Sequence, residues 1–122
     1  MCGCGGNKMT YALVNIGMSL LIGIIFILSA LILQKNPPTD INAVYGYRTK
    51  RSMKNKDLWD VGNQYSAEVM KQNGLLMILI GSLIGLLFWY PHTMIAILIL
   101  MIVLIIRLFI RVEKKLKVLE KQ

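Results

Sequence analysis

The residues best suited to binding chemistry lie together in the middle of the chain, in the run Tyr45-Gly46-Tyr47-Arg48-Thr49. Two tyrosines flank a glycine that permits backbone bends, and the arginine that follows carries several hydrogen-bond donors. Arg48 could bind a carboxylate or a phosphate while the tyrosine rings supply a flat contact surface. The alternative is an interfacial belt, in which the tyrosines lie at headgroup depth and Arg48 pairs with lipid phosphate. The residue types leave both interpretations open.

Other residues with catalytic potential have simpler explanations. Asp57 and Asp60 could pair in acid–base chemistry, but acidic residues in the first turn of a helix also stabilise the positive end of its dipole. The single histidine, His92, falls in a turn, and the serines have no basic partner nearby in the sequence. Cys2 and Cys4, in a Gly-rich leader over residues 1–10, provide too few ligands for a metal. We therefore expect neither an enzyme nor a metal or cofactor site.

Two long blocks without charged side chains must position this central run. The chain has 122 residues, 56% of them hydrophobic, and no Asp, Glu, Lys or Arg occurs in 9–34 or in 72–106. Blocks of this length exclude a soluble globular domain and predict membrane spans. The second block is too long for one crossing and is interrupted at Pro91, which predicts a tight helical hairpin. The predicted fold is an all-α membrane domain, 11–110, with spans at about 11–33, 75–90 and 94–110.

The distribution of positive charge predicts the orientation of the chain in the membrane. Of the 14 Lys and Arg residues, 13 lie in the central segment 34–73 or from Arg107 onward, and only Lys8 lies on the other side. By the positive-inside rule the N-terminus is outside and the C-terminus cytoplasmic, in a bacterial cell membrane. A cleaved signal peptide is the alternative for 11–33, but this apolar run is longer than usual and lacks a cleavage pattern.

The central segment 34–73 is predicted to combine turns with one amphipathic helix. Pro37 and Pro38 end the first span, and a helix begins near Ser52 or Asn55, either of which could cap it. Its apolar positions, spaced at helical intervals, are Leu58, Val61, Tyr65 and Val69. We expect this helix to rest in the membrane interface, with its apolar side on lipid or on the spans, and to break at Gly74.

Two further patterns concern packing and the basic tail at 111–122. Gly81 and Gly85 form a GxxxG motif, which predicts close helix packing either within one chain or in a homodimer. In the tail, an apolar stripe opposes the basic residues, so the last helix is expected to extend along or out of the membrane. The stripe consists of Leu108, Val112, Leu116 and Leu119. The positive charge favours anionic lipid headgroups as partners, and no motif supports nucleic-acid binding.

The central segment carries a set of residues that can be compared with known families: Asn42, Tyr45, Gly46, Tyr47, Arg48, Thr49, Ser52, Met53, Lys54, Asn55, Trp59 and Asn63. This set resembles the signature of the SdpI family of bacterial integral membrane proteins, and the match extends over about 33–110. The family includes immunity proteins against a secreted, membrane-active killing peptide. Gly62 stands where alanine is expected, and the longer immunity proteins carry further spans that are not seen here.

The resemblance implies that the signature recognises a toxin peptide at the membrane surface, in a protective or sensing role. Arg48 would then be the polar anchor. Tyr45, Tyr47 and Trp59 would be interfacial contacts, and Asn42, Thr49, Asn55 and Asn63 would form a hydrogen-bonding scaffold. The alternative function is a membrane scaffold or signalling protein that docks a cytoplasmic regulator through the signature segment and the basic tail.

Overall fold

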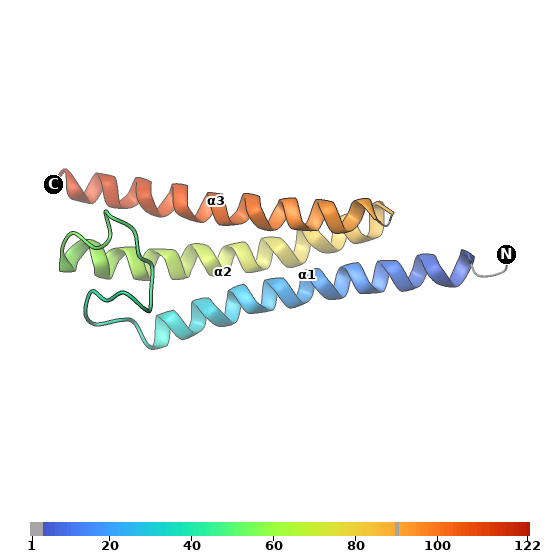
Figure 1. The fold of residues 1–122 in the computed structure, drawn as a ribbon, viewed down its shortest axis with the longest axis horizontal. Helices are drawn as coiled ribbons and strands as arrows, with labels where there is room; N and C mark the ends of the chain where they lie inside the picture. Colours follow the sequence, from blue (N-terminus) through green and yellow to red (C-terminus); the bar gives the residue numbers. More distant parts are fainter. Residues whose placement is uncertain (1–3, 90) are drawn as a thin grey trace.

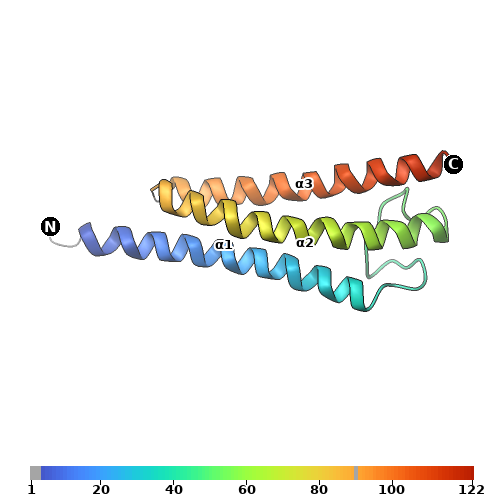
Figure 2. The same ribbon diagram turned by 180° about the vertical axis from the view of Figure 1, so that it is seen from behind.

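The computed structural model describes residues 4–89 and 91–122, which form three helices (Figure 1). These are α1 (Cys4–Lys35), α2 (Lys56–Leu87) and α3 (His92–Glu120). The middle helix, α2, lies between α1 and α3 in both views (Figures 1 and 2), and α1 and α3 scarcely contact each other. A tight turn joins α2 to α3, whereas a long loop, 36–55, joins α1 to α2. Two positions of the predicted elements, Cys2 and the end of the second span at residue 90, lie outside the described residues.

All three helices are long and apolar enough to cross a membrane, as expected for a multi-pass membrane protein. They contain 32, 32 and 29 residues. At about 1.5 Å per residue each exceeds the ~30 Å hydrocarbon core. Large apolar side chains remain exposed along their outer faces, among them Leu21, Leu79, Leu83 and Ile99. A continuous apolar surface of this kind is stable in lipid and not in water. The helix ends therefore project beyond the hydrocarbon layer.

The amphipathic stretch predicted as a separate interfacial helix is instead the first half of α2. The helix begins at Lys56, with Asn55 as its N-cap, and runs without a break through Gly74 to Leu87. Gly74 was expected to end a helix, but it lies where α2 packs against α1. A Cβ atom at Gly74 would lie 2.7 Å from the carbonyl oxygen of Gly23. The glycine therefore permits close backbone approach rather than a turn.

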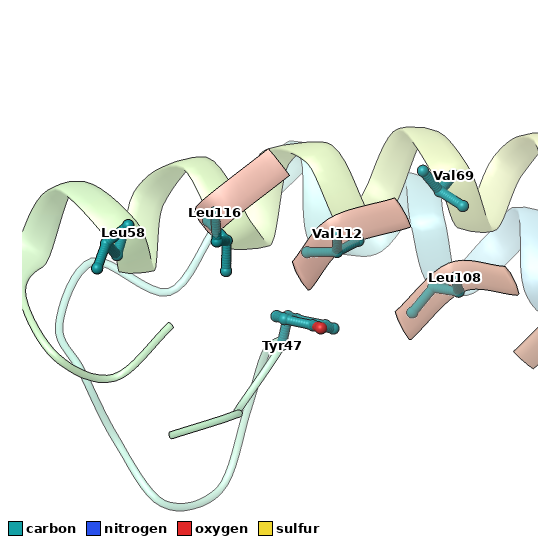
Figure 3. Close-up of a cluster of buried hydrophobic side chains, with 6 residues drawn as sticks. All are labelled: Tyr47, Leu58, Val69, Leu108, Val112 and Leu116. Carbon is teal, nitrogen blue, oxygen red and sulfur yellow. The ribbon is translucent and has the colours of Figure 1, made fainter. Parts of the chain in front are cut away.

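The apolar stripe of this first half of α2 packs against α3 rather than on lipid. Figure 3 shows the buried cluster, in which Leu58 and Val69 of α2 face Leu108, Val112 and Leu116 of α3. Val61, Tyr65 and Leu119 pack around it. The two stripes that the sequence predicted separately are thus two sides of one helical hairpin. Because each covers the other, neither needs the membrane interface to bury its apolar face.

Small residues form the interface between α1 and α2. A Cβ atom at Gly81 would clash with the side chain of Ser19, and one at Gly85 would lie 3.2 Å from Ile16. The GxxxG motif therefore packs against α1 of the same chain. Farther along, the buried amide of Asn15 donates to the hydroxyl of Thr93 at 2.6 Å and ties α1 to the start of α3.

Candidate functional site

The loop 36–55 carries most of the signature and is held against the helices by its own polar side chains. The carboxamide oxygen of Asn42 accepts from the backbone N–H groups of Val44 and Tyr45, at 3.0 and 2.7 Å, which closes a tight turn. The Tyr45 hydroxyl donates to the carbonyl of Asn36 at 2.9 Å, just after the end of α1. Carbonyls at a helix C-terminus lack partners within the helix, and this bond satisfies one nearby. Asn42 and Tyr45 therefore fix the path of the chain as it leaves the membrane.

Gly46 and Asn63 attach the middle of the loop to α2. Gly46 has a φ of 107°, a conformation that side chains disfavour, and a Cβ atom there would clash with the Asn63 carboxamide. That carboxamide oxygen accepts from the backbone N–H of Tyr47 at 2.6 Å, while its nitrogen donates to the carbonyl of Trp59 at 2.8 Å. The Trp59 indole donates to the carbonyl of Pro38 at 2.9 Å. The loop thus docks on one face of α2 through backbone contacts.

Trp59 differs from its predicted role as an interfacial contact, because it is fully buried at 0% exposure. Its ring lies under the loop, and its only polar group is satisfied inside the protein. Ser52, also buried, donates from its hydroxyl to the carbonyl of Tyr47 at 3.0 Å and accepts from the N–H of Thr49 at 2.8 Å. The Asn55 side chain accepts from the N–H of Leu58 at 2.9 Å and caps α2. Trp59 and Ser52 therefore shape the site from its interior, and Asn55 does so by capping α2.

Glu113, on α3, is the residue that sequence analysis missed. Its carboxylate accepts from the Tyr47 hydroxyl at 2.9 Å, from the Thr49 hydroxyl at 2.7 Å and from the Arg51 guanidinium at 2.8 Å. Arg51 also bridges to Glu120, two helical turns further along α3, at 2.7 Å. The loop 36–55, which we call the signature loop, is therefore held to the C-terminal part of α3 by Glu113 and Glu120, two acidic residues within an otherwise basic tail. We call these contacts the latch.

Burial and Glu113 together keep Tyr47 in its neutral form. The side chain is 7% exposed, and Figure 3 shows its ring beside Val112 and Leu108. Desolvation, and then the hydrogen bond and negative charge of Glu113, raise the pKa of Tyr47 well above its usual value. The ring also lies 5.7 Å from that of Phe109, centroid to centroid. Tyr47 acts as a hydroxyl donor and a core side chain, so a ligand could reach only its edge.

Arg48 behaves differently from its neighbours. Its side chain is exposed and makes no hydrogen bond or ion pair with any residue in 4–89 or 91–122. It lies at the wall of a cavity of about 470 Å³, which falls in the range of small-ligand sites. We call this cavity the lateral groove. Its other walls are mostly apolar and come from the loop and from α1, α2 and α3, and they include Phe26, Leu33, Met70, Ile105 and Phe109. The site thus combines one free cation with an apolar groove.

Some polar residues of the groove wall form hydrogen bonds within the protein. Asn73 of α2 donates to the carbonyl of Leu104 at 2.7 Å and accepts a hydrogen bond from Arg107 of α3. Within 4–89 and 91–122, no three His, Cys, Asp or Glu side chains lie close enough to hold a metal ion. The arrangement is suited to holding an amphiphilic ligand rather than to coordinating an ion.

Comparison with known proteins identifies relatives of the chain. The model of the SdpI/YfhL protein family matches residues 39–110, which include the signature loop, α2 and most of α3. The chain is 38% identical over 97 residues to the protein YfhL of Bacillus subtilis (strain 168), a match that covers 80% of this chain and 84% of that protein. No solved structure matches at a significant level.

Proposed function

This chain belongs to the SdpI/YfhL protein family, and we propose that it protects a bacterial cell against a secreted, membrane-active peptide, or senses one. In this proposal it binds the peptide at the membrane surface through the signature loop and the lateral groove. The role requires recognition and no catalytic step. Its ligand has an apolar part and a polar or acidic group, because the site pairs apolar walls with a single free guanidinium.

Arg48 carries this proposal. Of the basic residues in the loop, Arg51 and Lys54 are paired with acidic side chains of α3, and Lys50 does not line the groove. Arg48 lines it and has no acidic partner in the described part of the chain. An unpaired guanidinium beside apolar walls is suited to a charge-assisted, bidentate contact with an anionic group. The rest of the signature supports the position of this one side chain.

The orientation that we propose has the N-terminus outside and the signature end in the cytoplasm. Thirteen of the 14 basic residues lie at the signature end, which supports a cytoplasmic location. A peptide that acts on the membrane would then reach the groove from within the bilayer. The groove permits this route because its walls belong to the spans and Ile105 and Phe109 are 38% and 46% exposed.

A survival assay tests this function. A peptide-sensitive bacterium expresses the protein, an Arg48→Ala variant, a Lys50→Ala variant or an empty vector, at equal abundance in the membrane. Lys50 is a matched control because it is exposed, has the same charge and lies outside the groove wall. We expect protection by the protein and by Lys50→Ala, and its loss with Arg48→Ala. Equal survival of the Arg48 and Lys50 variants would remove Arg48 from the site, and no protection by the intact protein would refute the role.

A second candidate function is a scaffold that docks a cytoplasmic regulator. The end of α3 favours it, because Lys114 and Lys117 are exposed there and make no hydrogen bond or ion pair with described residues. An acidic surface on a soluble protein would fit them. Lys114→Glu with Lys117→Glu should abolish regulator binding in a pull-down from membranes if the scaffold function holds. Peptide protection should persist in the same variant, because neither residue touches the groove.

A further inference from the structure

The lateral groove lies at the depth of one membrane leaflet. On α1 its wall runs from Phe26 to Leu33, about 10 Å along the helix axis, and ends at the last turn before Lys35. One leaflet contributes about 15 Å to the hydrocarbon core. Arg48 closes the groove at the end where the loop begins. The apolar walls therefore face acyl chains, and the guanidinium lies at headgroup level.

A groove at this depth is not left empty in a bilayer. Because α1 and α3 scarcely contact each other, the groove opens between them along this stretch. Apolar side chains that line an empty void lose dispersion contacts. The medium next to the lateral groove consists of acyl chains, which can fill it. An acyl chain is thus the occupant that the surroundings supply without any protein partner.

The charge at the polar end favours a negative headgroup. Arg48 has no acidic partner in the described chain, and the nearest acidic side chain of α3, Glu113, is occupied by three donors of the loop. Arg107, bonded to Asn73 in the groove wall, adds a second positive charge nearby. All six acidic residues and 13 of the 14 basic residues of the chain lie at this end of the bundle, which leaves it strongly positive.

We propose that the lateral groove binds one phospholipid with a net negative headgroup, whose phosphate contacts Arg48 and one of whose acyl chains lies between α1 and α3. The size of the cavity fits a lipid chain, whereas only part of a peptide helix could enter it. A helix with its side chains is about 10 Å wide, so a cavity of 470 Å³ would hold only about one turn of it. The lipid site does not depend on the protective role.

Native mass spectrometry of the purified full chain tests this site. The protein is released from nanodiscs of phosphatidylglycerol alone or of phosphatidylcholine alone, and the fraction that carries one lipid is measured. We expect one retained phosphatidylglycerol per chain and little retained phosphatidylcholine. Arg48→Gln should lower retention of phosphatidylglycerol by roughly fivefold or more, because it removes the charge-assisted contact with the phosphate inside the groove. Lys50→Gln, which removes the same charge outside the groove, should retain it as the unmodified protein does.

A groove-filling variant separates a lipid in the groove from loose attraction to the basic end. Ser29 of α1 is exposed and lines the groove, so Ser29→Phe fills it while Arg48 remains. We expect this variant to lose the retained lipid while circular dichroism shows unchanged helix content. Retention equal to that of the unmodified protein in Ser29→Phe, or in Arg48→Gln, would overturn the proposal.

Equal retention of both lipids would also overturn it. So would a protein that retains no phosphatidylglycerol from phosphatidylglycerol nanodiscs but captures a membrane-active peptide through Arg48 in phosphatidylcholine nanodiscs. That result would make a peptide the occupant and leave the protective role standing. Retained phosphatidylglycerol in a protein that gives no protection supports the lipid site and refutes the protective role. The two proposals therefore fail in different experiments.

Discussion

Removing the carboxylate of Glu113 should release the signature loop from α3. Glu113 accepts three hydrogen bonds from the loop, at 2.7 to 2.9 Å, and its side chain is 30% exposed. A hydrogen bond to a charged group contributes about 1.5–3 kcal/mol when buried, whereas a solvent-exposed ion pair contributes about 1 kcal/mol or less. The bond to Arg51 resembles the solvent-exposed ion pair. The bonds to Tyr47 and Thr49 are expected to have strengths between those of an exposed ion pair and a buried hydrogen bond to a charged group. Glu113→Ala should therefore lower the free energy of loop opening by about 2–4 kcal/mol.

Hydrogen–deuterium exchange of the loop measures this change directly. The backbone N–H groups of Tyr47 and Thr49 are bonded to the side chains of Asn63 and Ser52, so they exchange only when the loop opens. A loss of 2–4 kcal/mol accelerates their exchange roughly 30- to 1,000-fold. Glu113→Gln keeps an acceptor for the two hydroxyl groups and loses mainly the ion pair, so it should accelerate exchange about fivefold.

Glu68→Ala is the control for this experiment. Glu68 lies exposed on α2 and has no hydrogen bond or ion pair with any described residue. Its removal should leave the exchange of the loop unchanged. Exchange in Glu113→Ala that matches the Glu68→Ala control would refute the latch. A Glu113→Gln variant as damaging as Glu113→Ala would show that charge, rather than the hydroxyl bonds, holds the loop.

Four other substitutions test the remaining contacts. Gly62→Ala should raise the free energy of unfolding by about 0.5–1 kcal/mol, since its Cβ would lie 3.4 Å from the nearest atoms, and a lower melting temperature in detergent would contradict this. Gly46→Ala, with its positive φ and a clash against Asn63, should cost more than about 2 kcal/mol and make the loop sensitive to trypsin. Gly74→Ala should separate α1 from α2 and lower the melting temperature, at a cost of about 1–3 kcal/mol. Because the pKa of Tyr47 is raised in the folded protein, the tyrosine of the unfolded chain ionises at a lower pH than that of the folded protein. The stability that the folded Tyr47 contributes is therefore fully present below pH 10.0 and is lost as the pH rises further. Tyr47→Phe should reduce this loss of stability in melting curves measured over a series of pH values.

Periodicity and charge predicted the helices but not which helix each apolar stripe would meet. The stripe from Leu58 to Val69 was expected to lie in the membrane interface with either lipid or the spans as its partner, so the sequence left that partner open. In the structure it meets the stripe from Leu108 to Leu116. Both stripes were visible in the sequence, 22–33 residues before Pro91 and 17–25 residues after it. A helical hairpin with its turn at Pro91 brings two such stretches alongside each other, so their positions on either side of the turn were the missed signal.

The latch was missed because its residues lie more than 60 positions apart along the chain. Glu113 and Glu120 are the only acidic residues after Arg107, and they are spaced by seven, which is two helical turns. Two acids on one face of a basic tail indicate a partner for basic residues elsewhere, and Arg51 and Lys54 are that partner. The signature residues were predictable as a group, but burial, which hides Trp59 and leaves Arg48 open, depends on tertiary packing.

Arg48 links the two proposals through competition. If an anionic lipid occupies the groove, a peptide that binds there must displace it, so the apparent affinity for the peptide falls as the content of anionic lipid rises. The same cation can then serve both ligands at different times, since each presents an anionic group beside an apolar chain. Peptide binding measured in nanodiscs of increasing phosphatidylglycerol content should weaken for the intact protein. It should change little for Ser29→Phe, whose groove holds neither ligand. Peptide affinity that is independent of lipid charge would show that the two ligands do not share Arg48.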